Sequence, residues 1–269
     1  MTVTPLPARQ VDTLNLLSCN ILAGARVQHY HEYVTRSWAS VLPTRRKLDN
    51  LDHLARLFEP FDVIGLQEAD AGSLRSGFRN QTRYLAEAAD MPYWSFQPNR
   101  PMGGLAHTAN GLLSRMQPNQ VLDYPLPGRI PGRGVMLACF DHHGDTLAVA
   151  IAHLSLGAQG RMRQLDFIGE LLSDYPHAVL MGDLNTGADS PEMQRLFRRT
   201  RLTPPRQPMP TFPSWRPQRA LDHILVSDGL RIERVWTLHT GGSDHLPLAA
   251  AIRLPEAGSH AQPVRRRSA

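Results

Sequence analysis

The chain has 269 residues, of which 42% are hydrophobic and 20% charged, a composition typical of a soluble globular protein. No apolar run approaches the ~20 residues needed to cross a bilayer, residues 1–11 lack the apolar segment of a signal peptide, and two cysteines give no disulfide framework, so we expect a cytoplasmic protein. The formal net charge of +5 does not by itself indicate nucleic-acid binding, but it is compatible with an anionic substrate.

The first third of the chain is predicted to contain two strands and two helices. Apolar runs at residues 14–22 and 61–68 are typical of buried strands. Helices are expected after Pro43 and from Gln81, because apolar residues recur there at helical spacing. The segment 25–42 is rich in His, Tyr and Trp and is long for a connection, which favours a lid or a substrate-contacting loop.

In the middle of the chain, strands are expected in adjacent pairs. The pairs are residues 93–97 with 109–115, and residues 135–140 with 146–154, the second pair joined by a hairpin turn. The segment 121–134 between the pairs is rich in Pro and Gly and predicts turns. A third helix is expected over residues 160–175, where Leu and Ile form an inner stripe.

Residues 178–185 form an apolar strand that ends in Gly182, Asp183 and Asn185. An Asp and an Asn two residues apart on an extended chain point to the same side. One of them could bind a divalent cation or a water molecule while the other holds a neutral oxygen. A plain turn is the alternative interpretation of this pattern.

The last part of the chain is predicted to hold one helix and three strands. Ser190 followed by Pro191 predicts a helix start, with Ser as the N-cap. The proline-rich segment 203–217 must be an extended loop. Strands are expected over residues 220–227, 230–238 and 248–254.

Roughly ten strands and four helices, without regular βαβ alternation, favour a pair of mixed sheets covered by helices over a doubly wound sheet. We expect an N-terminal extension over residues 1–12, one domain over residues 13–254, and a disordered basic tail over residues 255–269.

Polar side chains recur at the ends of the predicted apolar strands. A single such residue is often structural, but convergence from six strands is hard to explain by chance. The residues are Asn20, Gln67, Glu68, His153, Asp183, Asn185, Asp222, Asp244 and His245.

The stretches around these residues resemble the endonuclease/exonuclease/phosphatase superfamily, which has the DNase I-like fold. In the superfamily's order they are Ser18-Cys-Asn20-Ile-Leu, Leu66-Gln-Glu68, Ala152-His153-Leu-Ser155, Met181-Gly-Asp183-Leu-Asn185, Leu221-Asp222-His-Ile-Leu-Val-Ser227 and Gly242-Ser-Asp244-His245-Leu-Pro247. The resemblance implies an α+β fold, a four-layer αββα sandwich of two mixed β-sheets flanked by helices, with the site at one edge of the packed sheets. It also implies a metal-dependent phosphoester hydrolase.

The resemblance gives Glu68 the role of a direct Mg²⁺ ligand, which suits the preference of this ion for a few carboxylates. Asn20 and Asp244 are expected to complete or support the metal shell, and Mn²⁺ is expected to be able to replace Mg²⁺. His245 is expected to act as a general base on water or as an electrostatic partner of the phosphate, with Asp222 orienting it.

Asp183 and Asn185 would position the attacking water and hold a phosphoryl oxygen, and His153 would donate to a non-bridging oxygen. Asn110 lies in a stretch that also resembles the superfamily, Ala109-Asn-Gly-Leu-Leu-Ser-Arg115, and either contacts the substrate or caps a local turn. Arg129 and Arg133 flank a Gly-rich turn and could reach an anionic substrate.

The sequence leaves the substrate open among a small molecule, a lipid head group and a nucleic acid. A phosphodiesterase acting on a small or lipid-like phosphodiester is the first choice. A DNA or RNA endo- or exonuclease is the alternative, because aromatic residues in the loops could stack on bases. A catalytically inactive binding protein is the remote alternative. No obligate protein partner is evident.

Overall fold

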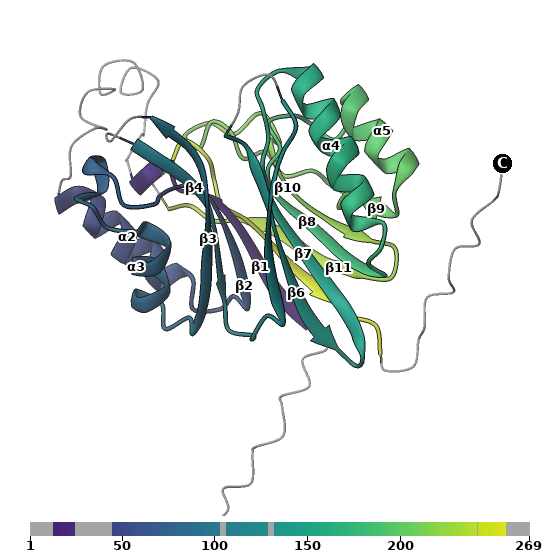
Figure 1. Cartoon of the computed structure of the whole chain (residues 1–269), viewed down its shortest axis with the longest axis horizontal. Helices are drawn as coiled ribbons and strands as arrows, with labels where there is room; N and C mark the ends of the chain where they lie inside the picture. Colours follow the sequence, from purple (N-terminus) through teal and green to yellow (C-terminus); the bar gives the residue numbers. More distant parts are fainter. Residues whose placement is uncertain (1–12, 25–44, 103–105, 129–131, 241, 257–269) are drawn as a thin grey trace, which may run out of the picture.

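The computed structural model of the chain describes residues 13–24, 45–102, 106–128, 132–240 and 242–256. Within them, two six-stranded sheets lie face to face, and helices cover the outer face of each sheet (Figure 1). Both sheets contain parallel and antiparallel pairs. The α+β, four-layer αββα sandwich predicted from the sequence is therefore confirmed.

The first sheet contains strands from both ends of the domain. Its members are β1 (Thr13–Asn20), β2 (Val63–Asp70), β3 (Tyr93–Met102), β4 (Ala106–Ser114), β11 (Arg231–Thr237) and β12 (Leu248–Arg253). The strand order is β11-β12-β1-β2-β4-β3. Two helices, α2 (Arg45–Leu57) and α3 (Gln81–Ala88), pack Leu51, Leu54 and Leu85 against its outer face.

The second sheet is built from the middle of the chain. Its members are β5 (Gln120–Pro125), β6 (Gly134–His142), β7 (Asp145–His153), β8 (His177–Asp183), β9 (Leu202–Thr203) and β10 (Asp222–Ser227). The strand order is β5-β6-β7-β8-β10-β9. Two helices, α4 (Ala158–Leu172) and α5 (Pro191–Arg199), cover it with Leu165, Ile168 and Leu196. No helix in the described ranges is long and apolar enough to cross a membrane.

The strand directions place several strand ends at one edge of the sandwich. β1 runs parallel to β2, with Asn20 opposite Gln67, and β7 runs parallel to β8, with His153 opposite Asp183. β10 runs antiparallel to β8 and begins at the same edge, with Asp222 opposite Asp183. Since the carboxyl ends of parallel strands meet at the same edge of a sheet, the polar residues that follow them gather there.

Most predicted elements are present, and the differences lie in the irregular segments. The predicted turn segment 121–134 was wrong in part, because β5 pairs with β6 along residues 120–125. The predicted N-cap Ser190 is confirmed, since its hydroxyl accepts from the backbone nitrogen of Met193 at 3.3 Å. The predictions for residues 1–12, the loop 25–42, Arg129 and the tail from residue 257 lie outside the described residues.

Candidate active site

The end of β8 lies at the centre of the site, and Gly182 explains its local geometry. Gly182 has φ 147°, and a Cβ added to it would overlap the backbone oxygen of Ala152 on the neighbouring strand. Glycine therefore lets β8 stay close to β7 up to its last residue. The next residue, Asp183, is buried and faces the side chains from the other strand ends.

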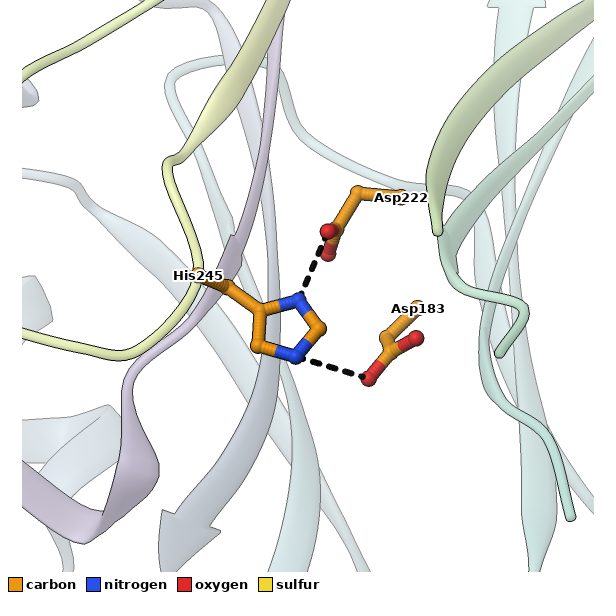
Figure 2. A group of neighbouring side chains, drawn as sticks. All are labelled: Asp183, Asp222 and His245. Carbon is orange, nitrogen blue, oxygen red and sulfur yellow. Dashed lines mark hydrogen bonds and ion pairs between the residues drawn. The ribbon is translucent and has the colours of Figure 1, made fainter. Parts of the chain in front are cut away.

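His245 lies between two carboxylates from the second sheet (Figure 2). Its Nδ1 is 2.7 Å from Oδ2 of Asp222, and its Nε2 is 3.8 Å from Oδ2 of Asp183. The imidazole comes from the loop before β12, and the ring of Phe212 lies 5.0 Å from it. This geometry fixes the ring and leaves Nε2 facing the centre of the site, as expected for an oriented catalytic histidine.

Sequence reasoning missed Thr211, which supports this pair. Its hydroxyl donates to Oδ2 of Asp222 at 2.6 Å, the same oxygen that bonds to His245. Thr211 is fully buried, and the other oxygen of Asp222 has no hydrogen-bond partner among the described residues. No signal in the sequence identifies Thr211, because it lies within a proline-rich segment that shows no periodicity.

Asn20 connects the two sheets at the centre of the site. Its Nδ2 is 3.4 Å from Oε1 of Glu68 and 3.3 Å from Oδ2 of Asp183. Glu68 has φ 56° and lies where the register between β2 and β4 shifts. This bulge interrupts the regular alternation of side chains between the two faces of β2. Bulges of this kind change the direction of side chains next to active sites.

Several carboxylates share this edge, and burial together with their mutual repulsion raises their pKa values. Burial, then the charge of Asp244, raises the pKa of Glu68. Burial, then Asp222, raises the pKa of Asp183 to about 7, and burial raises the pKa of Asp244. A divalent cation would relieve this charge, and carboxylate and amide oxygens suit a hard ion such as Mg²⁺. Ligand atoms of Asp183, Asp222 and His245 also lie within 4.8 Å of one another, so the cluster could hold a metal ion.

The two histidines of the site are held in opposite charge states. Burial alone would lower the pKa of His245, but Asp222, Asp183 and Asp244 outweigh it and raise that pKa to about 10. Burial, then the charges of Arg133 and His245, lowers the pKa of His153 well below its ordinary value. His153 is therefore neutral at pH 7, with Nε2 lying 3.5 Å from Oδ2 of Asp183.

The remaining predicted residues occupy the margin of the site. Arg133 is partly buried, and burial lowers its pKa while Glu68 and Asp183 oppose that shift. Asn185 has φ 55° and donates from Nδ2 to the backbone oxygen of Leu154 at 2.9 Å. β8 ends at Asp183, so the expectation that Asp183 and Asn185 lie on one extended strand, and point to the same side for that reason, was wrong.

Asn110 is buried in a network between the two sheets. Its Nδ2 donates to Oε1 of Gln97 at 3.1 Å and to the backbone oxygen of Gly134 at 2.9 Å. Its oxygen accepts from Asn99 at 3.3 Å. These contacts hold the backbone beside Arg133, and direct contact of Asn110 with a substrate stays a prediction.

The chain belongs to the Endonuclease/Exonuclease/phosphatase family, whose model matches residues 13–245. This is a family of phosphoester-hydrolysing enzymes, and the resemblance found in the sequence is confirmed. No curated protein sequence matches the chain.

Solved structures share the fold at low sequence identity. An endonuclease/exonuclease/phosphatase from Beutenbergia cavernae is 20% identical, with a TM-score of 0.71 over 91% of this chain and 72% of that one. A mannosyl-6-phosphatase from Bacteroides thetaiotaomicron is 16% identical, with a TM-score of 0.67 over 89% and 99% of the two chains. Sphingomyelinase C from Streptomyces griseocarneus is 18% identical, with a TM-score of 0.61 over 89% and 99%.

Proposed function

We propose that this chain is a metal-dependent phosphodiesterase that hydrolyses a small or lipid-like phosphodiester. The observation that carries the proposal is the oriented His245, bonded to Asp222 through Nδ1 at 2.7 Å and facing Asp183 through Nε2 at 3.8 Å. In this proposal a bound cation would offset the charges of Asp183 and Asp244 and so favour the neutral form of His245, whose Nε2 then accepts a proton from the attacking water. The imidazolium that results is stabilised by Asp222.

The metal site in this proposal consists of Glu68, Asn20 and Asp244. The contact between Nδ2 of Asn20 and Oε1 of Glu68 at 3.4 Å supports it, and burial raises the pKa values of Glu68 and Asp244 in the absence of a cation. The group of Asp183, Asp222 and His245 is less suited to a cation, since Asp222 and His245 already bond to each other. When bound, Mg²⁺ would polarise a phosphoryl oxygen and offset the carboxylate charge around His245.

The other side chains would bind and orient the reacting groups. Asp183 and Asn185 position the water and hold a phosphoryl oxygen. His153, neutral at pH 7, donates a hydrogen bond to a non-bridging oxygen without adding charge. Arg133 supplies the positive charge that attracts an anionic substrate. We also propose substrate contacts for Asn110 and Arg129.

The substrate class is tested with a panel, because the fold does not choose it: the similar structures include a phosphatase and a sphingomyelinase. Bis-p-nitrophenyl phosphate is compared with p-nitrophenyl phosphate, with Mg²⁺, Mn²⁺ or EDTA present. Sphingomyelin, phosphatidylinositol phosphates, RNA, and single-stranded and abasic DNA follow. We expect metal-dependent hydrolysis of the diester. Hydrolysis of the monoester alone would refute the diesterase, and preferential cleavage of DNA or RNA would favour the nuclease alternative.

A further inference from the structure

Asn20 is followed by a short turn at the end of β1, and Glu68 lies in the bulged turn of the chain near the end of β2. Both segments contain residues with left-handed backbone conformation. Leu22 and Ala23 have φ 45° and 52°, and Glu68 has φ 56°. Each non-glycine residue held in this region costs roughly 1–3 kcal/mol and persists only where its surroundings fix it. The contacts that fix these turns therefore decide where the side chains of Asn20 and Glu68 lie.

The side-chain amide of Gln81 bonds to both turns. Its Nε2 donates to the backbone oxygen of Ala23 at 2.9 Å, and its Oε1 accepts from the backbone nitrogen of Asp70 at 2.8 Å. Ala23 lies three residues after Asn20, and Asp70 lies two residues after Glu68. Gln81 is 2% exposed and is the first residue of α3, outside both strands. One buried amide thus joins the segments that follow Asn20 and Glu68, in addition to the backbone pairing of β1 with β2.

Further contacts hold each turn on its own side. Asn20 accepts at Oδ1 from the backbone nitrogen of Leu22 at 3.1 Å. The carboxylate of Asp70 accepts from the backbone nitrogens of Gly72 and Ser73 at 2.9 and 2.6 Å. These bonds make each turn rigid, but they do not join the turn after β1 to the turn after β2. Between the strand ends, the backbone nitrogen of Ile21 donates to the backbone oxygen of Gln67 at 3.0 Å, and Gln81 adds the side-chain link beyond this bond.

We propose that Gln81 is a positioning residue for the metal site, setting the separation of Asn20 and Glu68. This inference rests on the proposed function, which assigns these two side chains to the metal. Replacing the amide by an apolar side chain of similar size leaves the oxygen of Ala23 and the nitrogen of Asp70 without their partner. The strained turns then relax, and the two ligands lose their common geometry.

Binding of Mn²⁺ without substrate, followed by electron paramagnetic resonance, tests this role. In Gln81→Leu we expect the dissociation constant to rise about 10–100-fold, the range found when partners of metal ligands are removed. Excess Mn²⁺ should restore most of the kcat of this variant, because His245 and Asp222 are untouched. Gln81→Glu retains the acceptor for Asp70 and loses the donor to Ala23, so its affinity should fall between wild type and Gln81→Leu.

Gln164→Leu is the matched control. Gln164 is equally buried, and it makes two hydrogen bonds to Ser155, in the loop that follows His153. We expect a similar loss of thermal stability but a dissociation constant for Mn²⁺ within twofold of wild type. Equal weakening in both variants, or wild-type affinity in Gln81→Leu, would overturn the proposal. If Gln81→Leu does not fold, Gln81→Glu decides the question. Failure of the wild-type chain to bind Mn²⁺ or hydrolyse a phosphoester would instead refute the proposed function.

Discussion

The hydrogen bond from Thr211 to Asp222 controls the orientation of His245, because both neighbours bond to the same carboxylate oxygen. Thr211→Val keeps the shape of the side chain and removes this donor. We expect kcat on bis-p-nitrophenyl phosphate to fall about tenfold, the effect of losing a hydrogen bond to a charged group worth roughly 1.5 kcal/mol. KM should change little, since Thr211 lies behind the pair rather than at the substrate.

Thr203→Val is the control for this substitution. Thr203 lies in the same part of the chain, is exposed, and donates to the backbone oxygen of Val226 at 3.2 Å, away from Asp222. Steady-state kinetics should show wild-type kcat for it. A kcat for Thr211→Val equal to that of Thr203→Val would contradict the supporting role of Thr211.

Glu68 is the side chain on which the metal assignment depends most. Glu68→Ala removes a carboxylate from the site, and we expect Mg²⁺-supported hydrolysis of bis-p-nitrophenyl phosphate to fall to the level of wild-type protein in EDTA. Glu87→Ala is the control, because Glu87 is an exposed carboxylate on α3 that pairs with Arg83. Near-wild-type activity of Glu68→Ala in Mg²⁺ would refute the ligand role.

Among the strands, β8 requires a glycine at position 182 to pack against β7. A Cβ at position 182 would overlap the backbone oxygen of Ala152, and the substituted residue would have to adopt φ 147°. Gly182→Ala should therefore lower the free energy of unfolding by more than ~4 kcal/mol, a loss seen only for severe steric or backbone conflicts. Gly157→Ala, at a position with φ −88° and open space around it, should cost no more than about 1 kcal/mol. Urea denaturation measures both, and equal losses would contradict this account.

The elements that could be predicted from the sequence are those whose apolar pattern is continuous. β8 and β7 are almost wholly buried, so their apolar runs and the polar residues that end them are visible in the chain. β5 mixes partly buried and exposed residues without regular alternation and lies in a segment rich in proline and glycine, so its sequence does not indicate a strand. Buried strands can therefore be predicted from their apolar runs, but a partly exposed edge strand such as β5 cannot.

Of the candidate site, only the side chains at its centre could be predicted from the sequence, and the residues that support them from behind could not. Glu68, Asp183 and His245 stand at strand or loop positions with a recognisable neighbourhood in the sequence. Thr211 bonds to Asp222, which lies 11 residues away in the sequence, and Gln81 bonds to Ala23, which lies 58 residues away. Nothing in the sequence around Thr211 or Gln81 distinguishes them from other polar residues. Positions of this kind depend on how loops pack over strand ends, which no periodicity encodes.

For the whole molecule, one apolar layer lies between the sheets and one lies beneath each helix pair. The central layer joins Leu16 and Ile252 of the first sheet to Val149 and Met181 of the second. Because each sheet buries one face against the other, separating the sheets would expose the central apolar layer of both halves to water. The domain should therefore unfold as one cooperative unit.

The two cysteines test this cooperativity, since each reports on a different outer layer. Cys19 lies under α2 and α3, and Cys139 lies under the helices of the second sheet. Burial raises the pKa of both thiols, so neither should react with Ellman's reagent at pH 8 in the folded protein. In Cys139→Ser and Cys19→Ser, the remaining thiol should become reactive over the same urea range in which the helical circular dichroism is lost. Reaction of one thiol at clearly lower urea than the other would show that one helix layer opens independently.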